Sequence, residues 1–242
     1  MLQISTDPGG PGSGVQTLKG VELFAELDDE ARRACERRCA WRWWEPGEQI
    51  LDRAAMTTDV YFVIKGRGRV IDYSLSGHRE VIFDEIGEGG YFGELSAIDG
   101  EPRSANIVAV ERTLTASLSG DDLIELVTSH PQAAILLMRR LTEVIRLASA
   151  RIMDLSTLAA QNRIYSDLLR EARTGGKLIP NTATIRPIPH HHTIAARVST
   201  TRETVARVLS DLTRRNLLRR DKDALVITDV DMMTEMVQKF RP

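Results

Sequence analysis

Cysteine is nearly absent from this chain: Cys35 and Cys39 are the only two among 242 residues. Two thiols cannot supply a disulfide framework or the four ligands of an iron–sulfur cluster. Their C-x3-C spacing could in principle touch a metal, but two ordinary thiols in a reducing compartment are the simpler interpretation. We therefore expect no metal site at this pair.

Long hydrophobic runs are also lacking. Hydrophobic residues make up 42% of the chain and charged residues 27%, and the charged residues interrupt every stretch that could approach membrane-spanning length. The first fourteen residues are rich in Gly and Pro and lack the basic start and apolar core of a signal peptide. We expect a disordered leader over residues 1–17 and a cytoplasmic protein with no membrane partner.

A large net charge is missing too, but the small total hides an asymmetry. The formal net charge is −2, whereas residues 161–242 alone hold fifteen Lys and Arg against nine Asp and Glu. The C-terminal part is therefore basic and the rest of the chain acidic. This distribution indicates that only the C-terminal part meets a polyanion.

The most informative segment is residues 87–105, where an acid and a base accompany several glycines. Glu94 offers a carboxylate that can accept hydrogen bonds from a sugar hydroxyl, and Arg103 can grip a phosphate with two parallel N–H bonds. Glycines at positions 87, 89, 90 and 93 allow the backbone to approach a ligand closely. The segment is neither a Walker A motif nor a dinucleotide fingerprint, and a plain glycine-rich turn is the alternative. The pattern favours a site for a small phosphorylated nucleoside.

The surrounding segments have the pattern of a compact β domain. Residues 23–39 predict a short helix, and from residue 48 to residue 118 short β-rich runs alternate with turn signals. That spacing is typical of an antiparallel barrel or roll, with the glycine-rich segment as its one short helical insertion. Ser119, followed three residues later by Asp122, predicts the start of a further helix.

A long helix is predicted from Pro131 onward, and its apolar residues form a narrow stripe. The steps along the stripe alternate between four and three residues, which is the spacing of a coiled coil. We expect a parallel dimer seam; a helix that packs on its own domain is the alternative and usually shows a broader stripe. The seam residues are Met138, Leu141, Ile145, Ala148, Ile152 and Leu155, flanked by Ala134 and Ala159.

The basic C-terminal part has the pattern of a helix-turn-helix. Residues 193–198 and 202–216 predict two helices joined by a turn of hydroxyl residues, and a β-hairpin wing follows at residues 217–227. Arg202, Glu203 and Arg207 lie near the start and on the outer side of the second helix, where base-reading side chains are found. Thr200 and Thr201 are placed to contact DNA phosphates at its N-terminus.

Three motifs in this order resemble the CRP/FNR family of bacterial transcription regulators, most closely its cyclic AMP receptor branch. They are Phe-Gly-Glu-Leu-Ser at residues 92–96, Pro-Arg-Ser-Ala at residues 102–105 and Thr-Arg-Glu-Thr-Val-Ala-Arg at residues 201–207. The resemblance implies an α+β fold: a jelly-roll-like cyclic-nucleotide-binding β-roll over residues 18–130, a dimerisation helix over 131–160 and a winged helix-turn-helix over 161–242.

The resemblance also implies roles for single residues. The phosphate-binding cassette would comprise Gly93, Glu94, Leu95, Ser96, Arg103 and Ser104, with Glu94 on the ribose 2′-hydroxyl and Arg103 and Ser104 on the cyclic phosphate. Arg202, Glu203 and Arg207 would read a TGTGA-like half-site. Haem-based family members carry their ligand within the cassette, where this chain has Phe-Gly-Glu-Leu, so haem is not expected.

Base selection departs from the family pattern. A Thr-Ser pair that recognises adenine in the cyclic AMP receptor corresponds here to Ala148 and Ser149, of which only Ser149 can bond to a base. Ser104 corresponds to a hydroxyl that contacts guanine in cyclic GMP domains. Both cyclic AMP (cAMP) and cyclic GMP (cGMP) therefore stay open as the allosteric ligand.

The leading hypothesis is a homodimeric regulator, switched by a cyclic nucleotide, that binds an inverted-repeat DNA operator and works with RNA polymerase. One alternative keeps the DNA function without a nucleotide or with another ligand. The other is an enzyme, which the cassette does not favour because it offers one carboxylate and no nucleophile–base pair. The run His190-His191-His192 invites a metal, but no second cluster supports one. We expect no catalytic residue, no catalytic cofactor and no metal.

Overall fold

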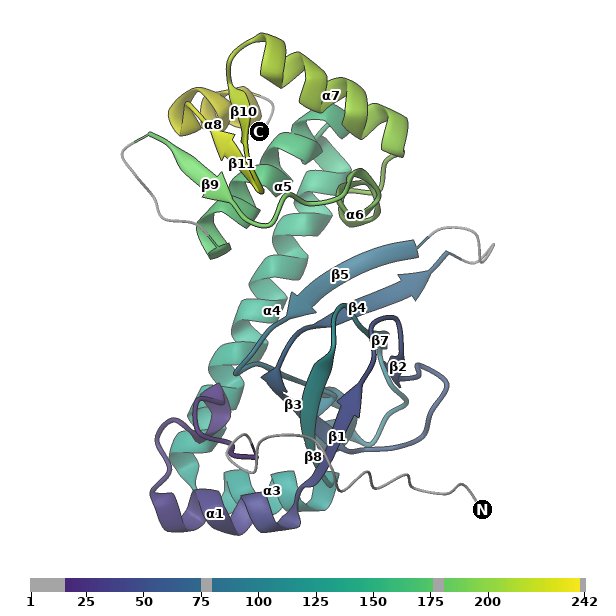
Figure 1. Cartoon of the computed structure of the whole chain (residues 1–242). Coiled ribbons are helices and arrows are strands. Elements are labelled where there is room, and N and C mark those ends of the chain that lie inside the picture. The colour runs from purple at the N-terminus through teal and green to yellow at the C-terminus, as the bar shows by residue number, and fades with distance from the viewer. Residues whose placement is uncertain (1–15, 75–79, 176–180, 240–242) are drawn as a thin grey trace. The chain divides into compact units, whose positions relative to one another are not determined.

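The computed structural model describes residues 16–74, 80–175 and 181–239 (Figure 1). It divides into two compact units. The first comprises Met1–Ile71 and Asp84–Arg140, and the second comprises Asp72–Phe83 and Leu141–Pro242.

Two four-stranded sheets belong to the first unit, except for the adjoining ends of β4 and β5, which fall in the second. Their strand orders are β1-β8-β3-β6 and β2-β7-β4-β5, and the paired registers are antiparallel. The strands are β1 Ala40–Trp44, β2 Gln49–Leu51, β3 Val60–Lys65, β4 Gly68–Tyr73, β5 Glu80–Ile86, β6 Tyr91–Phe92, β7 Asn106–Ala109 and β8 Thr113–Leu118. This arrangement confirms the predicted antiparallel roll and the mixed helix-and-sheet fold class.

The two sheets enclose an apolar core because their strands turn alternate side chains inward. Val63, Phe92 and Ile107 are buried in this core. Trp44 is buried as well, and its indole Nε1 donates to Thr115 Oγ1 at 2.8 Å. The buried polar atoms of this pair therefore satisfy each other.

The N-terminal helical segment differs from its prediction. Instead of one helix over residues 23–39, a 3-10 turn η1 at Glu22–Phe24 is followed by helix α1 at Asp29–Arg38. The Asp28 carboxylate accepts from Ala31 N at 2.8 Å and so starts the helix late. The predicted start at Ser119 is confirmed, since its hydroxyl caps helix α3 at Gly120–Ser129.

Helix α4 extends over Pro131–Thr157, ending before residue 160. One face is buried at Ala133 and Leu137. The predicted seam residues lie mostly exposed: Met138 at 53%, Ile145 and Ile152 at 65% and Leu155 at 49%, with Ala148 exposed and Leu141 half-buried. Along the described ranges, no helix is both long and apolar enough to cross a bilayer.

Beyond the end of α4, the second unit contains a winged helix-turn-helix. Its sheet has the order β10-β11-β9. Its elements are α5 Ala160–Gly175, β9 Ala183–Ile185, α6 His191–Arg197, α7 Arg202–Arg214, β10 Leu218–Asp221, β11 Ala224–Ile227 and α8 Val230–Gln238 (Figure 1). The two predicted helices and the wing are confirmed, with α6 beginning two residues earlier and α7 ending two residues earlier than expected.

Two arginines fasten α5 to the helix-turn-helix. Arg197 on α6 donates to the buried Asp167 carboxylate through Nε at 3.1 Å and Nη2 at 2.8 Å. Arg163 on α5 donates to the carbonyl oxygens of Val198 and Ser199, at 2.9 and 3.2 Å. These bonds fix the turn that precedes α7, so α7 has a defined position within its unit.

Candidate functional site

The predicted cassette forms a tight turn and a short helix between β6 and β7. Gly93 has φ +88°, and helix α2 at Glu94–Asp99 follows it at once. Gly100, with φ +73°, ends the helix. Only glycine adopts this left-handed backbone at little cost, so the two glycines set where the helix begins and ends.

Arg103 is the central side chain of the cassette, and it is only 3% exposed. Its Nη1 donates to the Gly93 carbonyl oxygen at 2.9 Å, and its Nη2 donates to the Asp59 carbonyl oxygen at 2.8 Å. Nε and Nη2 both donate to Thr57 Oγ1, at 3.3 and 3.0 Å. Burial lowers the pKa of Arg103, but a guanidinium stays protonated in proteins.

Gly93 leaves the space that Arg103 occupies. A Cβ at this position would lie 2.9 Å from Arg103 Nη1 and 2.8 Å from the Asp59 carbonyl oxygen. The glycine is therefore required both for its backbone angle and for the close approach of the guanidinium.

Glu94, at the first position of α2, is half-buried. Burial raises the pKa of this carboxyl, while a hydrogen bond from its own amide and the charges of Arg140 and Arg103 act in the opposite direction. A carboxylate that is partly shielded from water and close to a cation is suited to accept hydrogen bonds from a sugar hydroxyl.

The remaining predicted ligand residues fall in different settings. Ser96 is buried, Leu95 is 39% exposed and Ser104 is exposed. Ala148 and Ser149 are exposed on the part of α4 that belongs to the second unit. The structure therefore joins Gly93 and Arg103 directly. Thr57 is a contact that the motifs did not reveal, because it lies 46 positions from Arg103 in the chain.

Helix α7 has one buried and one exposed face. Val205, Val208 and Leu212 are buried and Leu209 is half-buried, so these residues form the inward face of the helix. The predicted base-reading residues Arg202, Glu203 and Arg207 are exposed. The helix thus presents a polar face that is free of packing within its own unit.

The N-terminus of α7 is capped by a hydroxyl. Thr201 Oγ1 accepts from Thr204 N at 3.2 Å, and Thr200 N donates to the Ala195 carbonyl oxygen at 3.0 Å. Hydrogen bonds from its own amide and from Thr201 lower the pKa of Glu203. Glu203 therefore remains an ionised acceptor at neutral pH, which suits it to bind a cytosine amino group.

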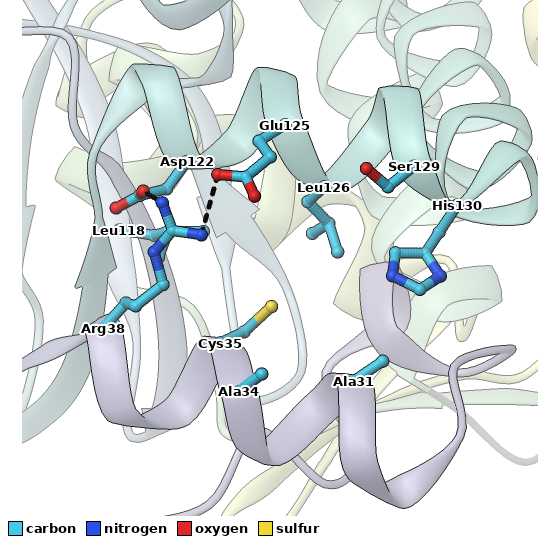
Figure 2. A pocket seen from close by; sticks show the side chains of 10 residues that line it. All are labelled: Ala31, Ala34, Cys35, Arg38, Leu118, Asp122, Glu125, Leu126, Ser129 and His130. Atoms are coloured by element: carbon cyan, nitrogen blue, oxygen red, sulfur yellow. Dashed lines mark hydrogen bonds and ion pairs between the residues drawn. The ribbon is translucent and has the colours of Figure 1, made fainter.

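A separate cavity of about 150 Å³ lies between α1 and α3 (Figure 2). At one end Arg38 pairs with Asp122 and with Glu125, the latter at 2.9 Å, so one guanidinium bridges two carboxylates. Burial raises the pKa of the Cys35 thiol, and the pKa of Cys39 to about 12. Both thiols are therefore protonated at neutral pH.

The geometry of the histidine run at residues 190–192 does not indicate a metal site. His190 and His192 stack with ring centroids 5.4 Å apart. Over the ranges that the structure describes, no group of three or more His, Cys, Asp or Glu side chains is placed to hold a metal ion.

Comparisons with known proteins match both units. Residues 41–130 match the family model of the cyclic nucleotide-binding domain, and residues 162–236 match that of the Crp-like helix-turn-helix domain. The chain is 30% identical over 220 residues to the cyclic AMP receptor protein of Thermus thermophilus, covering 90% of this chain and 98% of that protein.

Solved structures share the fold at lower identity. A CooA mutant from Carboxydothermus hydrogenoformans has a TM-score of 0.76 at 19% identity, with 90% of this chain and 94% of that chain covered. The c-di-GMP-responsive global regulator CLP of Xanthomonas campestris has a TM-score of 0.69 at 19% identity, with 83% and 99% covered. Given both domain matches and a relative that spans nearly the whole chain, this protein belongs to the CRP/FNR family: it is a transcription regulator with a cyclic nucleotide-binding domain and a DNA-binding helix-turn-helix domain, and not an enzyme.

Proposed function

We propose that the protein is a homodimeric regulator whose operator affinity is controlled by cAMP, with cGMP as the second candidate ligand. It acts in the cytoplasm on an inverted repeat of TGTGA-like half-sites and works there with RNA polymerase. The observation that carries the nucleotide function is the buried Arg103 guanidinium beside the half-buried Glu94.

The ligand assignment follows from the chemistry of these two groups. A buried guanidinium held by neutral oxygens keeps its full positive charge, and a cyclic phosphate is the anion that it can grip with two bonds. The carboxylate of Glu94 would accept from the ribose 2′-hydroxyl. Ser104 is exposed and available to the phosphate or to a base.

The dimer assignment rests on α4. Four large apolar side chains of the predicted seam are about half-exposed or more, which a coiled-coil partner would cover: Met138, Ile145, Ile152 and Leu155. Two copies joined along α4 would carry two α7 helices. A two-fold arrangement of reading helices fits an operator of inverted half-sites about one DNA turn apart.

The DNA assignment rests on the exposed face of α7 and on the wing. Arg202 and Arg207 can each bond bidentately to guanine O6 and N7, and Glu203 can accept from cytosine N4. Arg219, Arg220 and Lys222 are exposed on the hairpin that follows and would add phosphate contacts.

A second function keeps the DNA-binding role but assigns another ligand to the cassette. Ala148 cannot bond to a base, and a regulator with the same fold is described as c-di-GMP-responsive. Under this alternative, cAMP and cGMP both leave operator binding unchanged.

The experiment is operator binding by fluorescence anisotropy with no nucleotide, with cAMP and with cGMP. Salt is held constant, because phosphate contacts dominate protein–DNA affinity. We expect tighter binding with cAMP. Tighter operator binding with cGMP alone would make cGMP the ligand, with Ser104 as the residue that recognises guanine. Operator binding that tightens with neither nucleotide would favour the second function. The ligand has to bind the DNA-competent state better than the other state, or no shift occurs.

A further inference from the structure

Thr57 contacts the edge of Arg103 that a phosphate needs. Its Oγ1 accepts from both Nε and Nη2 of the guanidinium, at 3.3 and 3.0 Å. Nε and Nη2 together form the fork with which arginine binds a phosphate or carboxylate through two parallel bonds. In this structure a single hydroxyl oxygen occupies that fork.

The other donors of Arg103 are also engaged. Nη2 donates in addition to the Asp59 carbonyl oxygen at 2.8 Å, and Nη1 donates to the Gly93 carbonyl oxygen at 2.9 Å. With five N–H groups in all, the guanidinium has little capacity left for a further bidentate partner. The side chain is only 3% exposed, so a phosphate can reach the fork only after one of these acceptors moves.

Thr57 is the acceptor that can move at the lowest cost. Gly93 and Asp59 contribute backbone carbonyls, and Gly93 is held by its positive φ between β6 and α2. Thr57, by contrast, is an exposed residue of the loop at residues 52–59, and its hydroxyl can turn to water when it leaves the guanidinium.

We propose that Thr57 is a further residue of the ligand site: its hydroxyl holds the phosphate-binding fork of Arg103 in the ligand-free protein, and the cyclic phosphate has to displace it. The inference rests on the proposed function of the cassette. Replacement of the Thr57 hydroxyl by the phosphate is favourable because a charge-assisted, bidentate bond to phosphate is stronger than a bond to a neutral hydroxyl. The contact nevertheless lowers ligand affinity, since it stabilises only the ligand-free state.

Removal of the hydroxyl therefore strengthens ligand binding. Thr57→Val keeps the shape and loses the acceptor, so we expect it to bind cAMP roughly tenfold more tightly, on the scale of one hydrogen bond to a charged group. Thr57→Ser keeps the acceptor and should bind like the wild type. Thr58→Val, at the adjacent exposed position, is the matched control and should also leave affinity unchanged.

The test is a titration of the full-length protein with a fluorescein-labelled cAMP, followed by anisotropy. A second measurement needs no ligand: NMR of the arginine Nε–H groups, with the Arg103 signal assigned by its loss in Arg103→Lys. In ligand-free protein the Arg103 Nε–H should exchange with water slowly in the wild type and in Thr57→Ser, and faster in Thr57→Val.

Tighter binding and faster exchange in Thr57→Val, with both controls unchanged, would support the inference. Wild-type binding with unchanged or weaker affinity in Thr57→Val would overturn the inference and leave the proposed function intact. Failure of the wild type to bind any cyclic nucleotide would overturn the proposed function, whatever the exchange rate shows.

Discussion

At the scale of single residues, the cassette depends on where glycine and arginine lie relative to each other. Gly93 places its carbonyl oxygen 2.9 Å from Arg103 Nη1 and starts α2 with a left-handed backbone. A side chain at position 93 would disturb both the contact with Arg103 and the left-handed backbone. A conservative change at this one position should therefore act on the ligand and not only on stability.

Gly93→Ala tests this point. The added Cβ would collide with Arg103 Nη1 and with the Asp59 carbonyl, so we expect at least a tenfold loss of cyclic nucleotide affinity and about 1–2 kcal/mol of backbone strain. Gly47→Ala is the control: its φ is +83° and nothing lies within 4 Å of the added Cβ. It should lose similar stability but keep its ligand affinity. Equal affinities in the two variants, measured by calorimetry, would contradict the role of Gly93.

Ser199 offers a stability prediction in the turn of the helix-turn-helix. Its φ of +53° is unfavourable for any residue with a Cβ. Ser199→Gly should relieve this strain and raise stability by about 0.5–1 kcal/mol, after allowance for the greater unfolded-state entropy of glycine. Thermal unfolding should show a midpoint higher by about 1–4 °C.

The control for Ser199→Gly is Ser210→Gly, at an exposed position inside α7. Glycine in a helix interior costs about 0.5–1 kcal/mol relative to alanine, so this variant should be less stable. A lower midpoint in both variants would show that the turn is not strained at Ser199.

Sequence predicted some of these residues and not others, for a physical reason. Glu94, Arg103 and Arg202 belong to short motifs whose spacing is visible along the chain. Thr57 and Arg163 act across the fold: Thr57 reaches Arg103 from 46 positions away, and Arg163 reaches Val198 from 35. Contacts of this kind depend on strand pairing and helix packing, which a local pattern does not contain.

At the scale of elements, α4 is the helix with an unexplained apolar face. Its exposed stripe keeps a coiled-coil period, whereas Ala133 and Leu137 on another face are already buried within one chain. Packing on its own chain is therefore observed at Ala133 and Leu137, while the dimer seam on the exposed stripe stays a prediction.

Charge on the stripe should disrupt the dimer. Ile145 and Ile152 are both 65% exposed, so Ile145→Glu with Ile152→Glu should leave the folded monomer intact and place like charges in the seam. We expect a shift from dimer to monomer by multi-angle light scattering, with unchanged circular dichroism. Ser156→Glu, at an exposed position of α4 off the stripe, should remain a dimer. A monomeric wild type, or a dimeric double variant, would contradict the seam.

Helix α7 carries the base-reading prediction. In the proposed function Arg202 makes one bidentate guanine contact, so Arg202→Ala should cost about 1–3 kcal/mol of discrimination at a single symmetric base pair of the operator. Selection from randomised operators would show relaxed preference at that pair only. Weakening by the same factor on every sequence would indicate that Arg202 contacts phosphate instead.

Helix boundaries were harder to predict than the helices themselves. The long-range pattern placed α4 and α7 correctly, but residues 23–39 were predicted as one helix although Asp28 caps a separate helix α1. A side chain that caps a helix holds the preceding backbone in a non-helical conformation and so prevents one continuous helix. The sequence alone did not show which of several acidic residues acts as the cap.

At the scale of the whole molecule, a ligand that regulates DNA binding links nucleotide binding to operator binding thermodynamically. A nucleotide that raises operator affinity by some factor must itself be bound more tightly in the presence of operator by the same factor. The cassette and α7 belong to different units of the chain. Any coupling between them therefore has to pass through a change in the equilibrium between two states of the whole protein.

The measurement that tests this account most directly compares operator affinity in the wild type and in Arg103→Ala, each with and without saturating cAMP at one salt concentration. We predict that cAMP tightens wild-type binding by at least fivefold, on the scale of allosteric couplings, and that Arg103→Ala binds with the affinity of the ligand-free wild type under both conditions. Operator affinity that does not respond to cAMP in the wild type, or responds equally in Arg103→Ala, would contradict control of DNA binding through this cassette.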